Sequence, residues 1–497
     1  MGSEMCIRDR YFCNMIISSI KLLKNIPLSV GRNGVNYTRR NYQLTSAKAN
    51  EADQDRGKLK PLKDVPGPKE YPIIGSRLEW RKNQKNKVHL WWMELQRTYG
   101  DVVKVNMGGQ DIIYLFDPEY TQKMYGSDSL YPIQFGLLNF VWYRNVRRKE
   151  QYADGNAGVV GSTGSIWREQ RTAVNPDMMR KSSAMYYVED LHEISSDCVD
   201  RIAETRDENN EIRNALPDIG HSYALEQIYN IFLDVGIGAL NPDGMSPKCK
   251  SFLSNSKKMN TSMTIMEKQG PFWRFFDTPA YKKFDEASTY MHNQISNDLK
   301  KAYKRILKED VDKPRYEWSI SHKIVDRFGE NSTSPVIFVS ELTQAGVETT
   351  SFTVTTLLYH LADNPIKQQI AFEEVDRIFG GGKLNAEGFG QLRYLRACMM
   401  ESQRICPFGA GTSRILSNPI EVDGYLIPKG TTVLQASLVI GHDPRNYPEP
   451  ERFLPERYCV VIQIQLTLTH FPSSPLDTVQ EVVAEEGLQK CRFKLWL

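Results

Sequence analysis

One stretch of the chain places side chains that could move a proton inside an otherwise apolar segment. Ala345-Gly346-Val347-Glu348-Thr349-Thr350 lies within Ser340 to Asp363, a proline-free run that predicts a long helix. A glycine inside a helix costs about 1 kcal/mol relative to alanine, and β-branched threonines add to that cost. Alcohol side chains there can bond back to backbone carbonyls and bend the helix. The segment is therefore either a loosened helix with a proton-handling pair, Glu348 and Thr349, or a buried helix with a polar kink.

Two further pairs have spacings that bring their side chains together on one helix face. Glu401 and Arg404 stand three apart within Leu392 to Cys406, a segment that predicts a helix. Trp167 and Arg171 stand four apart, where a ring N–H and a guanidinium could hold an anionic ligand. Taken alone, each pair is better explained as an ordinary solvated or stacked pair on a helix surface.

Proline-rich segments flank the helical part of the chain. Pro66-Gly67-Pro68 predicts an extended and stiff entry to the folded body. Phe453-Leu454-Pro455-Glu456-Arg457-Tyr458, preceded by Pro448-Glu449-Pro450, is too rich in aromatic residues for a linker and predicts an ordered loop. Taken alone, that loop is most simply a plain surface loop.

The elements that must position these residues are mostly helical. His89 to Tyr99 predicts one helix, and most of Ser183 to Lys308 has apolar residues at every third or fourth position. Val102 to Val105 and Ile112 to Phe116 predict the two strands of a hairpin, and Gly424 to Val433 predicts a second short hairpin. No repeat of solenoid period is present. The sequence thus predicts a mainly α fold with a few small β-sheets.

Composition excludes several classes of protein. The 497 residues are 40% hydrophobic with a net charge of +3, so a large core is possible, while a nucleic-acid binder or an acidic disordered protein is not indicated. The eight cysteines include no C-x-x-C pair. This argues against a disulfide framework and a structural zinc site, and it fits a reducing compartment.

The N-terminal residues have the composition of segments that precede a folded domain. Residues 1–10 contain MCIRDR, which resembles translated sequencing-adapter DNA and is set aside as a probable artefact. Residues 11–50 hold several lysines and arginines, frequent Ser, Asn and Thr, and no Asp or Glu. This is typical of a mitochondrial transit peptide, the alternative being a disordered basic tail. Its apolar run is too short for a membrane anchor, which needs about 20 apolar residues. Residues 51–63 are charged and predict a linker.

In their order and spacing, these motifs resemble the cytochrome P450 family over residues 64–458. The resemblance rests on Trp-x-x-x-Arg, then Ala-Gly-x-Glu-Thr-Thr, then Glu-x-x-Arg, then Phe-x-Pro-Glu-Arg. Trp167-Arg168-Glu169-Gln170-Arg171, followed by Thr172-Ala173-Val174-Asn175-Pro176, resembles the mitochondrial branch of that family. The resemblance implies a mainly helical P450 domain with haem between two long helices. It also implies a haem-thiolate monooxygenase that inserts one oxygen atom of O₂ into its substrate.

The resemblance also implies a role for each motif residue in the long helix and in the Glu-x-x-Arg segment. Glu348 and Thr349 would deliver protons during oxygen activation. Ala345 and Gly346 would open the helix groove in which oxygen sits. A salt-bridge triad, structural rather than catalytic, would be formed by Glu401, Arg404 and Arg457.

Contacts to the haem and to a redox partner follow in the same way. Trp167, Arg171 and Arg414 would contact the haem propionates, which need charge partners when buried. Mitochondrial members of the family receive electrons from a small acidic ferredoxin, which docks on basic residues of the Glu-x-x-Arg helix. Arg396 matches one docking site, and Arg393 could replace a lysine that is missing from the other. The alternative for both arginines is a solvated helix face.

Location and substrate are implied only in outline. The family branch implies the matrix side of the mitochondrial inner membrane, with peripheral membrane contact. The substrate would be a small hydrophobic molecule, since apolar segments such as Phe135 to Trp142 and Pro271 to Phe276 could line its pocket.

The resemblance ends after Tyr458. The family continues with Phe-Gly-x-Gly-x-Arg-x-Cys-x-Gly, whose cysteine thiolate ligates the haem iron, and with a further helix. Residues 459–497 contain neither: Cys459 comes too early, and Cys491 is not in such a loop. No metal ligand is therefore assigned.

The codons that could encode this tail explain the departure. Read one base earlier, they permit L-P-F-G-Y-G-P-R-S-C-x-G-R-R-x-A-E-M, which resembles the haem loop of mitochondrial members. A single frameshift is the preferred hypothesis and an intron read-through the runner-up. Either the gene encodes an active monooxygenase and the tail is an error, or the chain is an inactive product unable to ligate haem iron.

Overall fold

The computed structural model describes the chain from residue 59 to residue 459. Residues within that range that it does not describe are 73, 84–87, 108–109, 134–139, 141, 153–157, 163, 179–185, 209–211, 213–214, 242–243, 270, 310–317 and 330–331. The predicted adapter segment, the transit peptide, most of the linker and nearly all of the aberrant tail lie outside the described residues.

The described residues form two compact units, each treated by itself below. The β-rich unit holds the described residues up to Ser129 together with Ala410–Glu451. The helical unit holds the described residues of Leu130–Gly409 and those from Arg452 onward. The expected mainly α fold with small β-sheets is confirmed.

The β-rich unit contains short strands and a few helices. In chain order they are β1 Lys60–Pro61, η1 Leu62–Asp64, α3 Arg77–Asn83, α4 Val88–Tyr99, β2 Val102–Asn106, β3 Asp111–Leu115, α5 Pro118–Gly126, β4 Thr412–Ile415, β5 Ile420–Val422, β6 Tyr425–Ile427, β7 Thr432–Gln435 and α19 Ser437–His442. The strands form one sheet in the order β2-β3-β7-β4 and another in the order β1-β6-β5. The first predicted hairpin is confirmed, since β2 and β3 pair antiparallel with Val102 opposite Leu115.

The second predicted hairpin, over Gly424 to Val433, is wrong. Its two strands lie in different sheets: β6 pairs with β5 and β1, whereas β7 pairs with β3 and β4. The actual hairpin joins β5 to β6 through Asp423 and Gly424, whose φ angles of 48° and 73° suit a tight two-residue turn. Beyond β6, Pro428 lacks a backbone N–H for pairing, and the chain turns at Gly430 into the other sheet.

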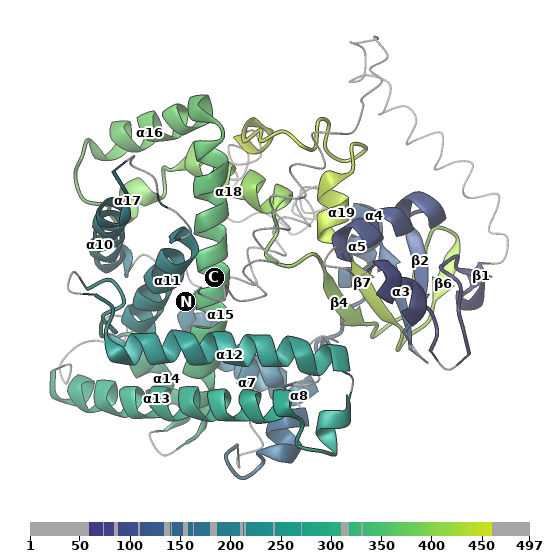
Figure 1. Ribbon diagram of the computed structural model, residues 1–497, viewed down its shortest axis with the longest axis horizontal. Coiled ribbons are helices and arrows are strands. Elements are labelled where there is room, and N and C mark those ends of the chain that lie inside the picture. The colour runs from purple at the N-terminus through teal and green to yellow at the C-terminus, as the bar shows by residue number, and fades with distance from the viewer. Residues whose placement is uncertain are drawn as a thin grey trace, which may run out of the picture. The chain divides into compact units, whose positions relative to one another are not determined.

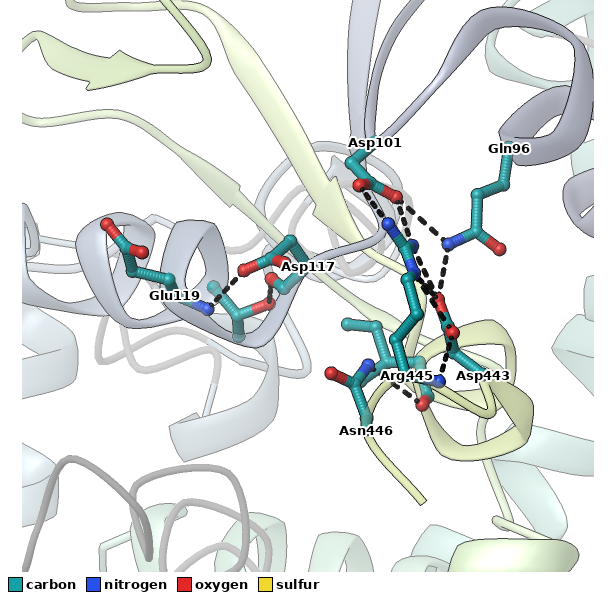
Figure 2. A network of polar contacts seen from close by, with 9 residues as sticks. Gln96, Asp101, Asp117, Glu119, Asp443, Arg445 and Asn446 are labelled. Atoms are coloured by element: carbon teal, nitrogen blue, oxygen red, sulfur yellow. Dashed lines mark hydrogen bonds and ion pairs between the residues drawn. The ribbon is translucent and has the colours of Figure 1, made fainter. Parts of the chain in front are cut away.

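An arginine-centred network ties the end of the β-rich unit to its beginning (Figure 2). The guanidinium of Arg445 donates to both carboxylate oxygens of Asp101, at 2.7 and 2.8 Å, and to Asp443 at 2.5–3.1 Å. The amide of Gln96 bridges the same two carboxylates at 3.0 and 2.9 Å. The hydrogen bonds from Arg445 lead the causes that hold the pKa of Asp101 below its usual value.

The helical unit consists almost entirely of helices (Figure 1). They are the π-helical turn η3 Tyr143–Arg147, α7 Gly158–Gly161, α8 Gly164–Met178, α10 Val188–Thr205, α11 Leu216–Leu233, α12 Pro247–Gln269, η4 Pro271–Arg274, α13 Pro279–Glu309, α14 Ile320–Phe328, α15 Ser334–Ala362, α16 Pro365–Phe379, α17 Ala386–Phe389 and α18 Arg393–Ile405. Helices α12 and α13 lie side by side, and α15 packs most extensively on α11.

Local sequence fixes where several of these helices begin and end. The hydroxyl of Ser319 caps α14 by accepting from the N–H of His322 at 3.2 Å, and Gly329 ends that helix with a φ of 85°. Proline in the first turn starts α11, α15 and α16, where its missing N–H is harmless. The main core of the unit lies between α11, α12, α13 and α15 and is lined by Leu225, Phe252 and Phe284.

Candidate functional site

The predicted acid of the long helix sits in a polar network between three helices. Glu348 of α15 accepts a hydrogen bond from the side-chain amide of Asn260 of α12, at 2.9 Å to Oε1. Its Oε2 lies 3.5 Å from Nε2 of His221 on α11. The other ring nitrogen of His221 lies 2.6 Å from the carbonyl oxygen of Pro217 and 3.3 Å from the hydroxyl of Ser351. Neither His221 nor Asn260 was identified from the sequence.

The threonine beside this acid is held by the helix backbone. Thr349 is buried, and its Oγ1 donates to the carbonyl oxygen of Ala345 at 2.8 Å, which is the back-bonding expected of an alcohol in a loosened helix. Gly346 serves packing: a Cβ built there would lie 2.4 Å from Cδ1 of Ile228, so its absence lets α11 approach α15 closely. Ala345 is exposed. The oxygen groove that the resemblance implies for Ala345 and Gly346 stays a prediction.

A second acid of α15 forms a buried ion pair that was also missed in the sequence. Glu341 pairs with Arg144 of η3, and the two side chains are only 3% and 5% exposed. The backbone N–H of Val160 in α7 donates to the other carboxylate oxygen at 2.9 Å. The guanidinium of Arg144 also lies over the ring of Tyr152, 5.3 Å from its centroid. This pair therefore ties η3 and α7 to α15.

The three residues of the expected triad are brought together. Glu401 is completely buried and accepts from Arg404 Nε and Nη2, both at 2.8 Å, and from Arg457 Nε at 3.3 Å. The backbone N–H of Leu454 donates to the same carboxylate at 3.0 Å. The triad thus fastens the proline-rich segment after Arg452 to α18, within the helical unit. Holding these two segments together requires no contact of the triad with substrate or haem.

The three predicted haem contacts lie in different surroundings. Trp167 and Arg171 are half-buried on α8 of the helical unit. Burial lowers the pKa of Arg171, and an anion beside that guanidinium would offset the cost. Arg414 is buried in β4 of the β-rich unit, where its Nε donates to Asp128 Oδ2 at 2.9 Å. The propionate contacts implied for Trp167, Arg171 and Arg414 stay predictions.

The two predicted docking arginines differ in exposure. Arg393 is exposed at the start of α18, whereas Nε of Arg396 is buried. The carboxylate of Glu374 accepts from the backbone N–H groups of Arg393, Tyr394 and Leu395, at 2.8–2.9 Å. A carboxylate at a helix N-terminus satisfies unpaired N–H groups, so the position of Arg393 is well fixed.

The described cysteines lie in surroundings that disfavour the thiolate form. Burial raises the pKa of Cys198 to about 11 and those of Cys249, Cys398 and Cys406 to about 12, and it also raises the pKa of Cys459. A ligating cysteine must lose its proton. In the part of the chain described here, no group of three or more His, Cys, Asp and Glu side chains is arranged to hold a metal ion. Among the described residues, Arg171 stays a predicted propionate contact, and none is assigned as the axial ligand of a haem.

Comparison with known proteins settles the family. A family model described as cytochrome P450 matches residues 65–463, which is more than half of the chain. The chain belongs to the cytochrome P450 family. This P450 is 29% identical to "Probable cytochrome P450 49a1" of Drosophila melanogaster over 80% of its own length and 69% of the relative's. It is 27% identical to "Cytochrome P450 CYP12A2" of Musca domestica and to "Cytochrome P450 12b1, mitochondrial" of Drosophila acanthoptera, over 84% of its own length and 78% of each relative's.

These similarities confirm the expected mitochondrial-type P450 and make the protein a monooxygenase by family, with haem as the cofactor that the family implies. They do not identify a substrate. Of the two apolar segments expected to line a substrate pocket, Phe135 to Trp142 lies largely outside the described residues. In the other, Trp273 is buried, while Phe275 and Phe276 are 74% and 69% exposed, and the pocket-lining role of Pro271 to Phe276 stays a prediction.

Proposed function

We propose that this P450 inserts one oxygen atom of O₂ into a small hydrophobic substrate, with Glu348 and Thr349 supplying the protons. The observation that carries the proposal is the organised surroundings of Glu348, which Asn260 orients through a 2.9 Å hydrogen bond. Haem, when bound, supplies the iron at which O₂ is activated. Thr349 keeps its hydroxyl fixed by bonding to the Ala345 carbonyl, and in this proposal the proton that Thr349 delivers is renewed from Glu348.

The test is substitution of Glu348 by glutamine in a haem-loaded enzyme whose C-terminal reading frame has been restored. We expect the rate of substrate oxidation to fall by about 10² or more, the usual contribution of a positioned acid. Substrate binding should remain, because the substitution preserves shape. A matched control is Glu373→Gln, an exposed acid of α16. Full activity of the Glu348 variant would overturn the proposed proton role.

We further propose that a small acidic ferredoxin supplies the electrons and that Arg393 contacts it. The exposure of Arg393 at the capped start of α18 supports this role, whereas the buried Nε of Arg396 makes that residue the weaker candidate. Charge reversal, Arg393→Glu, should raise the ferredoxin concentration needed for half-maximal electron transfer and weaken its salt dependence. The control is Lys300→Glu, an equal charge change at an exposed position of α13. Equal effects of the two changes would contradict a docking site at α18.

A mitochondrial location, on the matrix side of the inner membrane, is part of the proposal. It is supported by the acid-free composition of residues 11–50 and by relatives whose names include "mitochondrial". Among the described helices, none is long and apolar enough to cross a bilayer. The test is import of a reporter fused to residues 1–63 into isolated mitochondria. A reporter that stays outside would refute the transit peptide.

A second candidate function is favoured by the C-terminal residues. Residues 459–497 lack the ligand loop of the family. The chain as written would then be an inactive product that cannot ligate haem iron. A carbon monoxide difference spectrum decides between the two candidates. A thiolate-type band from the chain as written would exclude the inactive form, whereas a band only after the reading frame is restored would support the frameshift hypothesis.

A further inference from the structure

The ring of His221 is held in one protonation form at Nδ1. That atom lies 2.6 Å from the carbonyl oxygen of Pro217, one helical turn earlier on α11. A carbonyl oxygen can only accept, so Nδ1 must carry the hydrogen. Ser351 is compatible with this arrangement, because its hydroxyl lies 3.3 Å from Nδ1 and can itself donate to the Pro217 carbonyl at 3.5 Å. A neutral His221 would therefore present the lone pair of Nε2 on its other side.

That lone pair would face a carboxylate. Nε2 of His221 lies 3.5 Å from Oε2 of Glu348, and an ionised carboxylate is acceptor-only. Two acceptors facing each other repel, and a proton on either of them turns the contact into an attractive one. The second carboxylate oxygen is occupied by the amide of Asn260, which donates to it at 2.9 Å. Both side chains are about one-quarter exposed, 25% for His221 and 24% for Glu348, so water can reach them.

The close approach of the two helices is built into the sequence. A Cβ at Gly220 would lie 2.8 Å from Oγ of Ser351 and 3.0 Å from Oγ1 of Thr355, so glycine is needed beside His221. Gly346 has the same role from the other side, against Ile228. Two glycines, one on each helix, thus set the distance across which His221 meets Glu348.

We propose that His221 and Glu348 share one exchangeable proton and that His221 is the positioning residue that keeps Glu348 supplied with it. The imidazolium passes the shared proton from Nε2 to Oε2 of Glu348, and the acid then gives that proton up. His221 regains a proton at Nε2 from the hydrogen ions of the bulk solvent, so the charges and protons balance. This step rests on the proposed role of Glu348 in oxygen activation, but the shared proton itself does not.

The shared proton can be measured without haem. In the full chain labelled with ¹⁵N-histidine, the ring signal of His221 is identified by its absence from His221→Asn. At neutral pH we expect hydrogens on both ring nitrogens in the wild type. In Glu348→Gln we expect a hydrogen on Nδ1 only, because an amide can donate to Nε2. Controls are Glu373→Gln and, for the assignment, His192→Gln on α10. An unchanged His221 signal in Glu348→Gln would overturn the inference. If His221→Asn fails to fold, the signal of His221 can still be assigned by substituting the other histidines one by one.

The kinetic consequence separates this inference from the proposed function. In the frame-restored, haem-loaded enzyme, His221→Asn should lower kcat by about tenfold to 10²-fold, no more than the loss of the positioned acid itself, and leave the KM of the substrate unchanged. The double variant with Glu348→Gln should be no slower than Glu348→Gln alone, because the two residues act as one unit. An inactive wild type with the expected histidine signals would refute the proposed function alone. An active His221→Asn with an unchanged signal in Glu348→Gln would refute the inference alone.

Discussion

Replacing Glu341 by glutamine should destabilise the helical unit by about 3–5 kcal/mol, the usual cost of removing one partner of a buried ion pair. The side chains of Glu341 and Arg144 are 3% and 5% exposed, so the guanidinium would keep its charge where water cannot solvate it. The substitution isolates that charge, because the new amide oxygen can still accept the 2.9 Å hydrogen bond from the N–H of Val160.

The assay is urea unfolding of the full chain, followed by circular dichroism, with a double-mutant cycle. Arg144→Met alone should also destabilise the chain, since it leaves the carboxylate of Glu341 without its cation. The double variant Arg144→Met with Glu341→Gln removes both charges and should recover to within about 1 kcal/mol of the wild type. A matched control is Glu286→Gln, which breaks the more exposed pair with Lys258 and should cost less than about 1 kcal/mol.

Two results would refute the reasoning about this pair. A loss below about 1 kcal/mol for Glu341→Gln would mean that water solvates the guanidinium of Arg144. A double variant no more stable than Glu341→Gln would mean that the charge is not the cause of the loss. The loss would then have to come from packing around η3.

Three further substitutions test other parts of the structure. Glu401→Gln leaves the buried guanidinium of Arg404 and the partly buried one of Arg457 beside a neutral amide, and it should cost about 3–5 kcal/mol. A folded yield equal to the wild type in limited proteolysis would contradict this. Gly346→Ala places a methyl group 2.4 Å from Cδ1 of Ile228 and should cost about 1–3 kcal/mol in urea unfolding, most of it recovered by adding Ile228→Val. A neutral Gly346→Ala would show that the Ile228 side chain or α11 can shift. The hydrogen bonds from Arg445 lower the pKa of Asp101, so their stabilisation is present above the unfolded pKa, near 4, and is lost as the pH falls from there through the lower folded pKa. Arg445→Gln should thus be less stable by up to about 1 kcal/mol at pH 7, and the difference should shrink as the pH is lowered below about 4; a difference independent of pH would contradict this.

The fold was predictable wherever periodicity or β-branching was strong. The long helix expected over Ser340 to Asp363 is α15, which starts six residues earlier because Pro335 suits a first turn. The first hairpin was found from its β-branched strands. The second hairpin was predicted with its turn at Pro428 to Gly430, whereas the turn is at Asp423 and Gly424, two residue types that favour such turns. Strand partners far apart in the chain, such as β3 and β7, leave no local trace in the sequence and could not be predicted.

The site was predictable in part for a similar reason. Glu401 and Arg404 share one helix turn, so their pairing follows from spacing alone. Asp128, which pairs with Arg414, could not be found in this way, since 286 positions separate the two in the chain. The same holds for His221, whose importance comes from an α11–α15 contact that the sequence does not encode locally.

A physical rule could still have indicated that both acids of α15 have partners on other segments. Glu341 and Glu348 are the only acidic residues of that 29-residue helix, which has no lysine or arginine. They stand seven apart, two turns along one face, so both meet neighbouring helices rather than opposite sides of the molecule. A carboxylate on a mostly apolar helix is costly unless another segment supplies a donor or a cation. Two such acids therefore require two external partners, and the structure supplies Arg144 to one and His221 with Asn260 to the other. The first partner is an arginine that cannot give up its proton, which makes Glu341 a fixed structural anion. The second is a histidine that can, and this difference is what makes Glu348, and not Glu341, the acid able to take part in chemistry.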